Sequence, residues 1–222
     1  MKAILKNINI ELNKNLYLKD PNSSDLGKAI IYNSVLLIDE MGLEHFTFRK
    51  LAQSIKTTES TIYRYFENKH KLLTYLLSWY FKFIEHLVVI STSTIDDPIE
   101  KLSFCIKILS RIEEDNIQIL NLELLQKIII VESNKILHSK ELSKDLSLDT
   151  FEAYNQLCNR VSDIIIMINK DYKYAKSLAN ILIEGIYNQK FNCKYNKLLA
   201  DSMNKQDIEE FYFNLVINNI KT

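Results

Sequence analysis

Residues 47–73 read TFRKLAQSIKTTESTIYRYFENKHKLL, and this stretch decides the fold. Two short helical segments flank a tight polar turn, and a third segment begins after Asn68. The second segment gathers hydroxyls, aromatic rings and one arginine, while Ile62 and Phe66, at i and i+4, can anchor it to a small core. A short helix of this kind suits the reading of a DNA groove. The stretch therefore predicts a helix-turn-helix whose second helix enters the major groove.

The composition indicates an all-helical protein. The 222 residues include only 3 Gly and 2 Pro, and 47% are hydrophobic, which leaves little material for β-hairpins. The longest apolar runs, such as residues 164–168, span only about five residues, far short of a membrane helix. Polar residues from Lys6 onward interrupt any signal-peptide pattern. Cys105, Cys158 and Cys193 are widely spaced, as expected for reduced thiols in a cytoplasmic protein.

Apolar periodicity and capping residues divide the chain into helices. The pattern predicts helices over about 25–41, 48–55, 59–65, 68–90, 99–112, 117–137, 148–169, 172–190 and 205–220. Ser24, Thr47, Thr58 and Asp97 are the expected N-caps, and Gly42 is expected to end the first helix. We expect an N-terminal arm over 1–22, a helix-turn-helix domain over 23–75 and a second helical domain over 76–222.

Charge is distributed unevenly along the chain. Residues 1–90 carry 12 Lys and Arg against 9 Asp and Glu, whereas residues 91–222 carry 16 against 19. Arg49, Lys50, Lys69 and Lys71 lie in first turns of predicted helices, where a cation opposes the helix dipole by about a few tenths of a kcal/mol. A bound phosphate would make this arrangement favourable, because the helix N-terminus and the cations would both attract the phosphate. The charges therefore favour DNA binding by the N-terminal half.

These features resemble the DNA-binding domain of TetR-type transcriptional regulators. The resemblance rests on Gly42, the FTFRKLA stretch, the TIYRYF helix and the Asn68-Lys69-x-x-Leu72-Leu73 entry to the next helix. It implies an all-α fold: a three-helix N-terminal helix-turn-helix domain, linked by a fourth helix to a C-terminal ligand-binding and dimerisation domain. It also implies a ligand-responsive regulator, most often a repressor. The alternative function is a helical DNA-binding or architectural protein without a small-molecule ligand, acting through protein partners.

The resemblance implies a set of DNA contacts. They are Thr47, Arg49, Thr58, Glu59, Ser60, Thr61, Tyr63, Arg64, Tyr65 and Lys69. Tyr63, Tyr65 and Lys69 would hold phosphates, and Arg64 would read a guanine or meet the backbone. Glu59 would accept from a cytosine amino group or, as we favour, complement the helix N-terminus. Lys56 stands where the family usually has a turn glycine, so a left-handed conformation there would be strained. Thr57 replaces a small apolar residue.

The C-terminal half offers two further candidate surfaces. A last helix with apolar residues on more than one face needs two burial partners, which a symmetric four-helix dimer interface would provide. The candidate interface residues are Leu178, Leu182, Ile186, Ile208, Phe211, Tyr212 and Leu215. The candidate pocket for an apolar or amphipathic effector consists of Trp79, Phe83, Phe104, Cys105, Leu125, Tyr154 and Cys158. The alternative to the dimer interface is a monomer with a thicker core. The alternative to the effector pocket is an ordinary packed interior. A dimer would bind a palindromic operator in double-stranded DNA.

Other chemistry is sparse. His45, His70, His86 and His138 lack metal-ligand spacing, and no phosphate loop or nucleophile signature occurs, so we expect no metal, no cofactor and no enzyme activity.

The N-terminal arm is ambiguous. Ile8, Ile10 and Leu12 alternate as in a strand, whereas Ile4, Leu5, Ile8 and Leu12 also fit a helix. Four lysines, Lys2, Lys6, Lys14 and Lys19, outnumber two acidic residues. The arm either packs on its own domain or reaches DNA beside the main contact.

Overall fold

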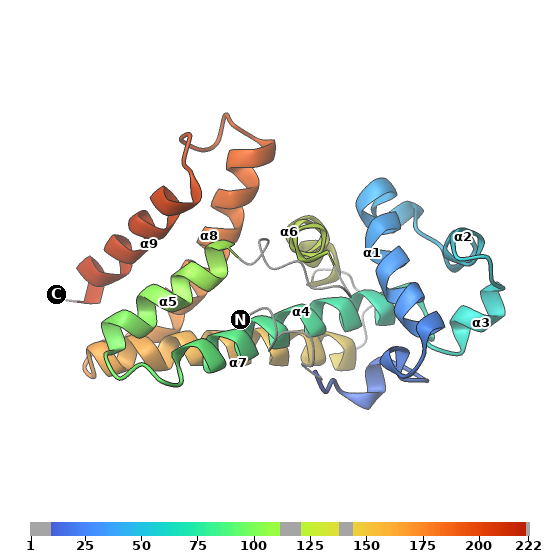
Figure 1. Cartoon of the computed structure of the whole chain (residues 1–222), viewed down its shortest axis with the longest axis horizontal. Helices are drawn as coiled ribbons and strands as arrows, with labels where there is room; N and C mark the ends of the chain where they lie inside the picture. The colour runs from blue at the N-terminus through green and yellow to red at the C-terminus, as the bar shows by residue number, and fades with distance from the viewer. Residues whose placement is uncertain (1–9, 112–120, 138–143, 221–222) are drawn as a thin grey trace. The chain divides into compact units, whose positions relative to one another are not determined.

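The computed structural model describes residues 10–111, 121–137 and 144–220, and every regular element in these ranges is helical (Figure 1). The α-helices are α1 (Asp25–His45), α2 (Phe48–Ser54), α3 (Glu59–Tyr63), α4 (Lys69–Thr92), α5 (Pro98–Arg111), α6 (Leu122–Leu137), α7 (Lys144–Ile168), α8 (Ala175–Tyr195) and α9 (Lys205–Ile220). Two 3-10 turns, η2 (Lys14–Leu16) and η3 (Pro21–Ser23), precede α1. The all-α prediction is confirmed. Residues 10–13 form no strand, and the rest of the ambiguous arm pattern, residues 4–9, lies outside the described residues.

The helix ends follow from local hydrogen-bonding chemistry. Ser24 Oγ accepts from the Gly27 N–H at 3.2 Å, and Thr47 Oγ1 accepts from the Lys50 N–H at 3.2 Å. The Asp97 carboxylate accepts from the Glu100 N–H at 3.0 Å. Gly42 has φ +74° and interrupts the helical conformation within α1, at the position where the sequence predicts the first helix to end.

Contacts between residues divide the chain into two compact units, which we describe separately. Unit 1 comprises residues 1–80 and 113–153, and unit 2 comprises residues 81–112 and 154–222. In unit 1 the α4 residues from Leu72 to Tyr80 are all buried, and α1 packs against α6. Unit 1 therefore contains the whole helix-turn-helix together with the first half of α4 and with α6 (Figure 1).

Unit 2 packs α5 and α8 against α9. Leu182, Ile183 and Ile186 of α8 are fully buried, and a side chain added at Gly185 would lie 2.8 Å from the Tyr212 ring. The Glu209 carboxylate accepts from Ser110 Oγ at 2.8 Å and from Arg111 Nη2 at 3.1 Å, which ties α9 to the end of α5. These contacts give unit 2 a core of its own.

Among the described residues, α4 alone is long and apolar enough to cross a membrane, but most of its apolar window is buried inside the protein. A buried core helix passes the same length and composition test, so this is weak evidence for a membrane span.

Candidate nucleic-acid interface

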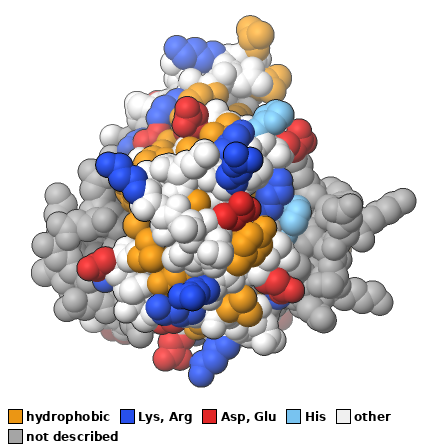
Figure 2. Space-filling view, turned by 90° about the vertical axis from the view of Figure 1, so that its right-hand side faces the viewer, with side chains coloured by type: hydrophobic (Ala, Val, Ile, Leu, Met, Phe, Trp, Pro, Cys, Tyr) orange, Lys and Arg blue, Asp and Glu red, His pale blue; other side chains and the backbone are white. Residues whose placement is uncertain are grey.

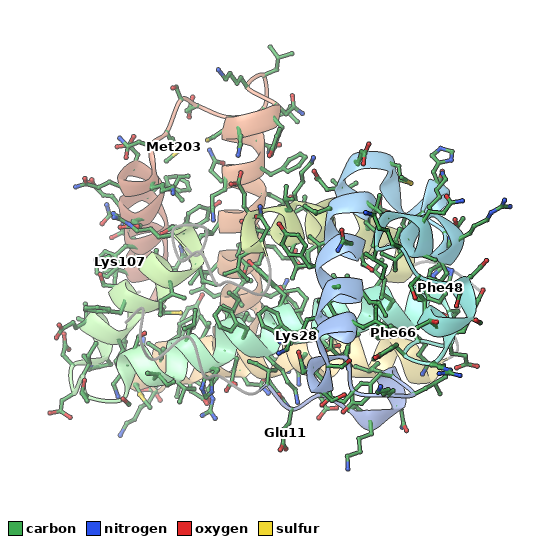
Figure 3. The ribbon with its side chains drawn as sticks, turned by 45° about the vertical axis from the view of Figure 1, so that its right-hand side comes forward. Glu11, Lys28, Phe48, Phe66, Lys107 and Met203 are labelled. Carbon is green, nitrogen blue, oxygen red and sulfur yellow. The ribbon has the colours of Figure 1, made fainter. Side chains whose placement is uncertain are left out.

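A small aromatic core holds α2 and α3 together. Phe48, Leu51 and Ile62 are buried, and the Phe48 ring meets the Tyr63 ring edge-on with centroids 5.0 Å apart. Phe46, also fully buried, packs edge-on against Phe48 at 6.4 Å. Figure 3 shows Phe48 and Phe66 at this end of unit 1. The two helices thus share one core, and the orientation of α3 follows from that of α2.

The turn between the two helices is strained as the sequence predicts. Lys56 has φ +55° and is the one non-glycine residue in the described ranges with a positive φ. The Thr57 N–H closes the turn by donating to the Ala52 carbonyl at 2.9 Å. A side chain in this left-handed conformation costs about 1–2 kcal/mol, because its Cβ approaches the following carbonyl oxygen.

Exposed hydroxyls gather at the start of α3. Thr58 makes no side-chain cap; its Oγ1 instead lies 2.9 Å from Ser60 Oγ and 2.8 Å from Thr61 Oγ1. Glu59 is exposed in the first turn, where a carboxylate complements the helix dipole. This end of α3 therefore presents donors and acceptors that can exchange partners with base edges or phosphates.

Positive charge surrounds these hydroxyls. Residues 47–64 carry four cations, Arg49, Lys50, Lys56 and Arg64, against the single carboxylate of Glu59, and all five side chains are exposed. Lys50 Nζ donates to the His45 carbonyl at 2.9 Å. Figure 2 shows Lys and Arg side chains spread among acidic and apolar ones over the face on the side of α2 and α3. The surplus of cations on this segment is what attraction to a phosphate backbone requires.

The two tyrosines of the TIYRYF segment have different surroundings. Tyr63 is 47% exposed, whereas Tyr65 is 3% exposed. The Tyr65 hydroxyl lies 2.8 Å from Ser24 Oγ, and its carbonyl accepts from the Leu18 N–H at 2.8 Å. The hydrogen bond with Ser24, aided by the nearby charges of Lys19 and Arg64, lowers the pKa of the Tyr65 hydroxyl. In this structure Tyr65 is an anchor for the end of the segment, which differs from the phosphate contact expected of it.

Lys69 also has inward partners. Its Nζ donates to the carbonyls of Leu43 at 2.9 Å, Glu44 at 3.3 Å and Phe46 at 3.4 Å. These carbonyls lie at the C-terminal end of α1, where a cation is stabilised by the helix dipole. Lys69 therefore fixes the corner between α1 and α2, whereas the sequence predicts a phosphate contact for it.

Residues of α6 also contact the end of α1, next to the corner between α1 and α2. Glu132 Oε1 accepts from the Leu43 N–H at 3.4 Å, and Lys127 Nζ pairs with Asp39 Oδ1 at 2.6 Å. The sequence analysis missed Glu132, Lys127 and Asp39, because nothing in their local pattern reveals partners about 90 residues away. Within unit 1, α1 is thus tied to both α4 and α6.

Residues 30–76 match the family described as bacterial regulatory proteins, tetR family. The chain carries a TetR-type DNA-binding domain. The predicted family resemblance is confirmed, since the match covers α2, the turn, α3 and the start of α4. No curated protein gives a significant match to the sequence.

Solved structures with the same fold span both units of the chain. AibR in complex with isovaleryl coenzyme A and operator DNA is 15% identical over 85% of this chain and 96% of its own, with TM-score 0.63. FadR from Bacillus subtilis in complex with stearoyl-CoA is 17% identical over 86% and 97%, with TM-score 0.65. A TetR-family transcriptional regulator from Bordetella parapertussis 12822 is 13% identical over 88% and 95%, with TM-score 0.64. At these identities the likeness concerns the fold.

The candidate effector residues fall into two groups. Trp79 and Leu125 belong to unit 1, while Phe83, Phe104, Cys105, Tyr154 and Cys158 belong to unit 2. Within unit 2 the Tyr154 hydroxyl donates to Asn180 Oδ1 at 2.8 Å, and its ring meets Phe81 edge-on at 4.9 Å. Burial raises the pKa of the Cys105 thiol to about 12 and also raises that of Cys158, so both behave as apolar side chains.

The candidate dimer residues are mostly internal to unit 2. Of the seven candidates, five are buried within the protomer: Leu178, Leu182, Ile186, Ile208 and Tyr212. Leu215 is half-buried. Phe211 of α9 is 50% exposed, and Ile181 of α8 is 55% exposed. The sequence pattern marked both the protomer core and the outer face of these helices, since α8 and α9 are apolar around a wide arc.

In the ranges that the structure describes, no three His, Cys, Asp or Glu side chains gather into a potential metal-binding group.

The strain at Lys56 gives a first prediction. Lys56→Gly should raise the free energy of unfolding by about 0.5–1 kcal/mol, because relief of the left-handed conformation exceeds the entropy that glycine adds to the unfolded chain. Lys56→Ala, which removes the same charge but keeps a Cβ, is the matched control and should give no such gain. Denaturant titration measures both. Equal stability of the glycine and alanine variants would contradict the strain.

Proposed function

We propose that this chain is a homodimeric, cytoplasmic transcriptional repressor that binds a palindromic operator and leaves it when a small apolar or amphipathic effector binds. The observation that carries the proposal is the exposed set of hydroxyls, tyrosine and cations on α2 and α3, within the domain matched by the family. Residues 23–75 would be the DNA-binding domain and residues 76–222 the effector and dimerisation domain. In this proposal the chain has no enzyme activity.

The proposed DNA contacts divide by position. Thr58, Ser60 and Thr61 would face the groove from the start of α3, while Thr47, Arg49, Tyr63 and Arg64 would meet the phosphate backbone. Each of the seven side chains except Thr61 is well exposed, which supports the assignment. Tyr65 and Lys69 would act indirectly, by fixing the end of α3 and the corner before α2. Glu59 would complement the helix dipole.

The DNA contacts can be tested without disturbing the core. Tyr63→Phe keeps the ring that packs on Phe48 but removes the hydroxyl, so operator affinity should fall by about tenfold, as expected when a hydrogen bond to a charged group is lost. Arg64→Gln should also reduce the salt dependence of binding, by a slope of about 0.9 per phosphate contact. Fluorescence anisotropy with operators selected from a random duplex pool measures both effects.

Tyr174→Phe is the matched control for the hydroxyl, since Tyr174 is a 67% exposed tyrosine of unit 2. Folded Tyr63→Phe and Arg64→Gln variants that bind DNA like the parent would refute the assigned interface.

The dimer proposal relies on apolar side chains that the protomer leaves exposed. Ile181 on α8 and Phe211 on α9 belong to two helices that pack on each other in unit 2, and each is at least half exposed. Burying them against a second copy would remove this apolar surface from water. A two-fold dimer would also present two reading helices to the two halves of a palindrome.

Charges on this face should dissociate the dimer. We expect Phe211→Glu and Ile181→Glu to sediment as folded monomers at micromolar concentration, because an unpaired charge buried in an interface costs several kcal/mol. Ile99→Glu makes the same change at a 40% exposed isoleucine in the first turn of α5 and should leave the dimer intact. A parent chain that is monomeric at tens of micromolar would rule out the dimer.

The effector proposal has two supports. The aromatic and thiol side chains named above are largely buried and offer few charges, which suits an apolar ligand. AibR and FadR, which share the fold, have been solved with acyl-CoA molecules. We therefore propose long acyl chains as the first effector class to test.

Stearoyl-CoA at about 100 times its Kd should stabilise the protein by about 2.7 kcal/mol and release the operator, whereas coenzyme A alone should do neither. Thermal unfolding and DNA anisotropy measure the two effects, and stearate separates the acyl chain from the nucleotide as the recognised part. If none of these ligands shifts either quantity, acyl effectors are excluded, and the alternative of a DNA-binding protein that acts through protein partners gains support.

A further inference from the structure

Residues 14–24, which we call the docked arm, precede the family match and pack closely on unit 1. Leu16 is 1% exposed, and the Tyr17 ring meets the Tyr75 ring edge-on at 5.9 Å. Asn22 Nδ2 donates to the Tyr75 hydroxyl at 3.0 Å. A Cβ at Gly27 would lie 2.2 Å from the Pro21 carbonyl oxygen, so glycine permits the closest approach of the arm to α1. The arm is thus a fixed part of unit 1.

The docked arm holds the segment that follows the reading helix. The Leu18 N–H donates to the Tyr65 carbonyl at 2.8 Å, and Ser24 Oγ lies 2.8 Å from the Tyr65 hydroxyl. On the other side, Lys71 Nζ donates to the Asn15 carbonyl at 2.8 Å. Tyr65 is therefore bound at its backbone and at its ring by residues more than 40 positions away.

Lys19 is placed by these contacts. It follows Leu18 directly, it is exposed, and its Nζ lies 5.0 Å from the centroid of the Tyr65 ring. Arg64, also exposed, precedes Tyr65, and both cations lower the pKa of the Tyr65 hydroxyl, so both lie near it. Two segments distant in sequence thus bring two cations to one tyrosine at the end of the reading helix.

The carboxylate nearest to Lys19 in sequence faces elsewhere. Asp20 Oδ1 accepts from the Asn22 N–H at 2.8 Å, and its charge raises the pKa values of Tyr17 and Tyr75 after the larger effect of their burial. In the described part of the chain no carboxylate forms an ion pair with Lys19. Lys19 lies over the Tyr65 ring and Arg64 precedes Tyr65 in the chain, so a phosphate beside Tyr65 would be attracted by both cations.

We propose that Lys19 is a further DNA contact, which the docked arm delivers to a backbone phosphate beside the one that Arg64 meets. The inference rests on the proposed DNA-binding function and adds a contact from outside the helix-turn-helix. The backbone bond of Leu18 and the ring of Tyr65 already restrict Lys19, so less side-chain entropy is lost on binding than for a free surface lysine. The contact would add affinity for any sequence, because phosphates carry no sequence information.

The test uses the full chain and a 5′-labelled duplex of about 30 base pairs and arbitrary AT-rich sequence, titrated at several salt concentrations. Lys19→Gln should weaken binding about tenfold near 0.1 M salt and reduce the slope of log K against log salt by about 0.9 for each protomer bound. Lys19→Arg keeps the charge and should restore both quantities.

Lys107→Gln is the matched control. Lys107 of α5 also lies over an aromatic ring, at 5.8 Å from Phe104, but it belongs to unit 2, so its loss should leave the slope unchanged. Thermal unfolding of Lys19→Gln shows whether the arm remains docked: a lower melting temperature with an unchanged salt slope means that Lys19 serves only to pack on Tyr65, and the proposal fails.

The Lys19 contact and the proposed DNA-binding function can be refuted independently. If Arg64→Gln reduces the slope and Lys19→Gln does not, DNA binding stands and the arm contact is refuted. If neither variant changes the slope, the DNA interface on α3 is refuted as well.

Discussion

Burial of the α4 segment from Leu72 to Tyr80 is the constraint on which the rest of unit 1 depends. A helix with apolar residues around its whole circumference is stable in water only when other elements cover all of its faces. All α4 residues from Leu72 to Tyr80 are buried. One of them, Tyr75, contacts three residues: Tyr17, Asn22 and Phe66. The TIYRYF segment enters α4 after a short turn, so the helix that must be buried also determines where the reading helix lies.

Two charged side chains, Lys69 of α4 and Glu132 of α6, connect these helices to the corner between α1 and α2. Lys69 from α4 binds the carbonyls of the corner after α1, and Glu132 from α6 binds its Leu43 N–H. Both contacts are hydrogen bonds to the backbone, which depend steeply on geometry, so a small rotation of either helix would break them. In the proposed mechanism an effector favours a state in which this corner moves, and operator affinity falls by the ratio of effector affinities for the two states. The corner can thus act as a two-state element, because it is bound by two helices with distinct connections.

The sequence predicts the local structure well and the long-range structure poorly. Ser24, Thr47 and Gly42 act at the helix ends where the pattern expects them, because capping and positive φ are determined by neighbouring residues. The inward partners of Tyr65 and Lys69 escaped the sequence analysis, since Ser24, Leu18 and the α1 carbonyls come near only through the tertiary fold. The sequence pattern assigns Leu182 and Ile186 to the dimer interface, whereas both are fully buried within the protomer, because core and interface require the same apolar side chains.

The division of the chain into units bears on how regulators of this kind can be recombined. The compact unit around the reading helix includes residues 113–153 in addition to residues 1–80, so it is discontinuous in sequence. A hybrid that joined residues 1–80 to a foreign C-terminal domain would leave the face of α1 that packs on α6, and the Leu43 N–H, without α6 and Glu132. The foreign domain would have to supply an equivalent of α6, including an acceptor at the corner. Exchange of sensor domains is therefore limited to partners whose own sixth helix can complete this core.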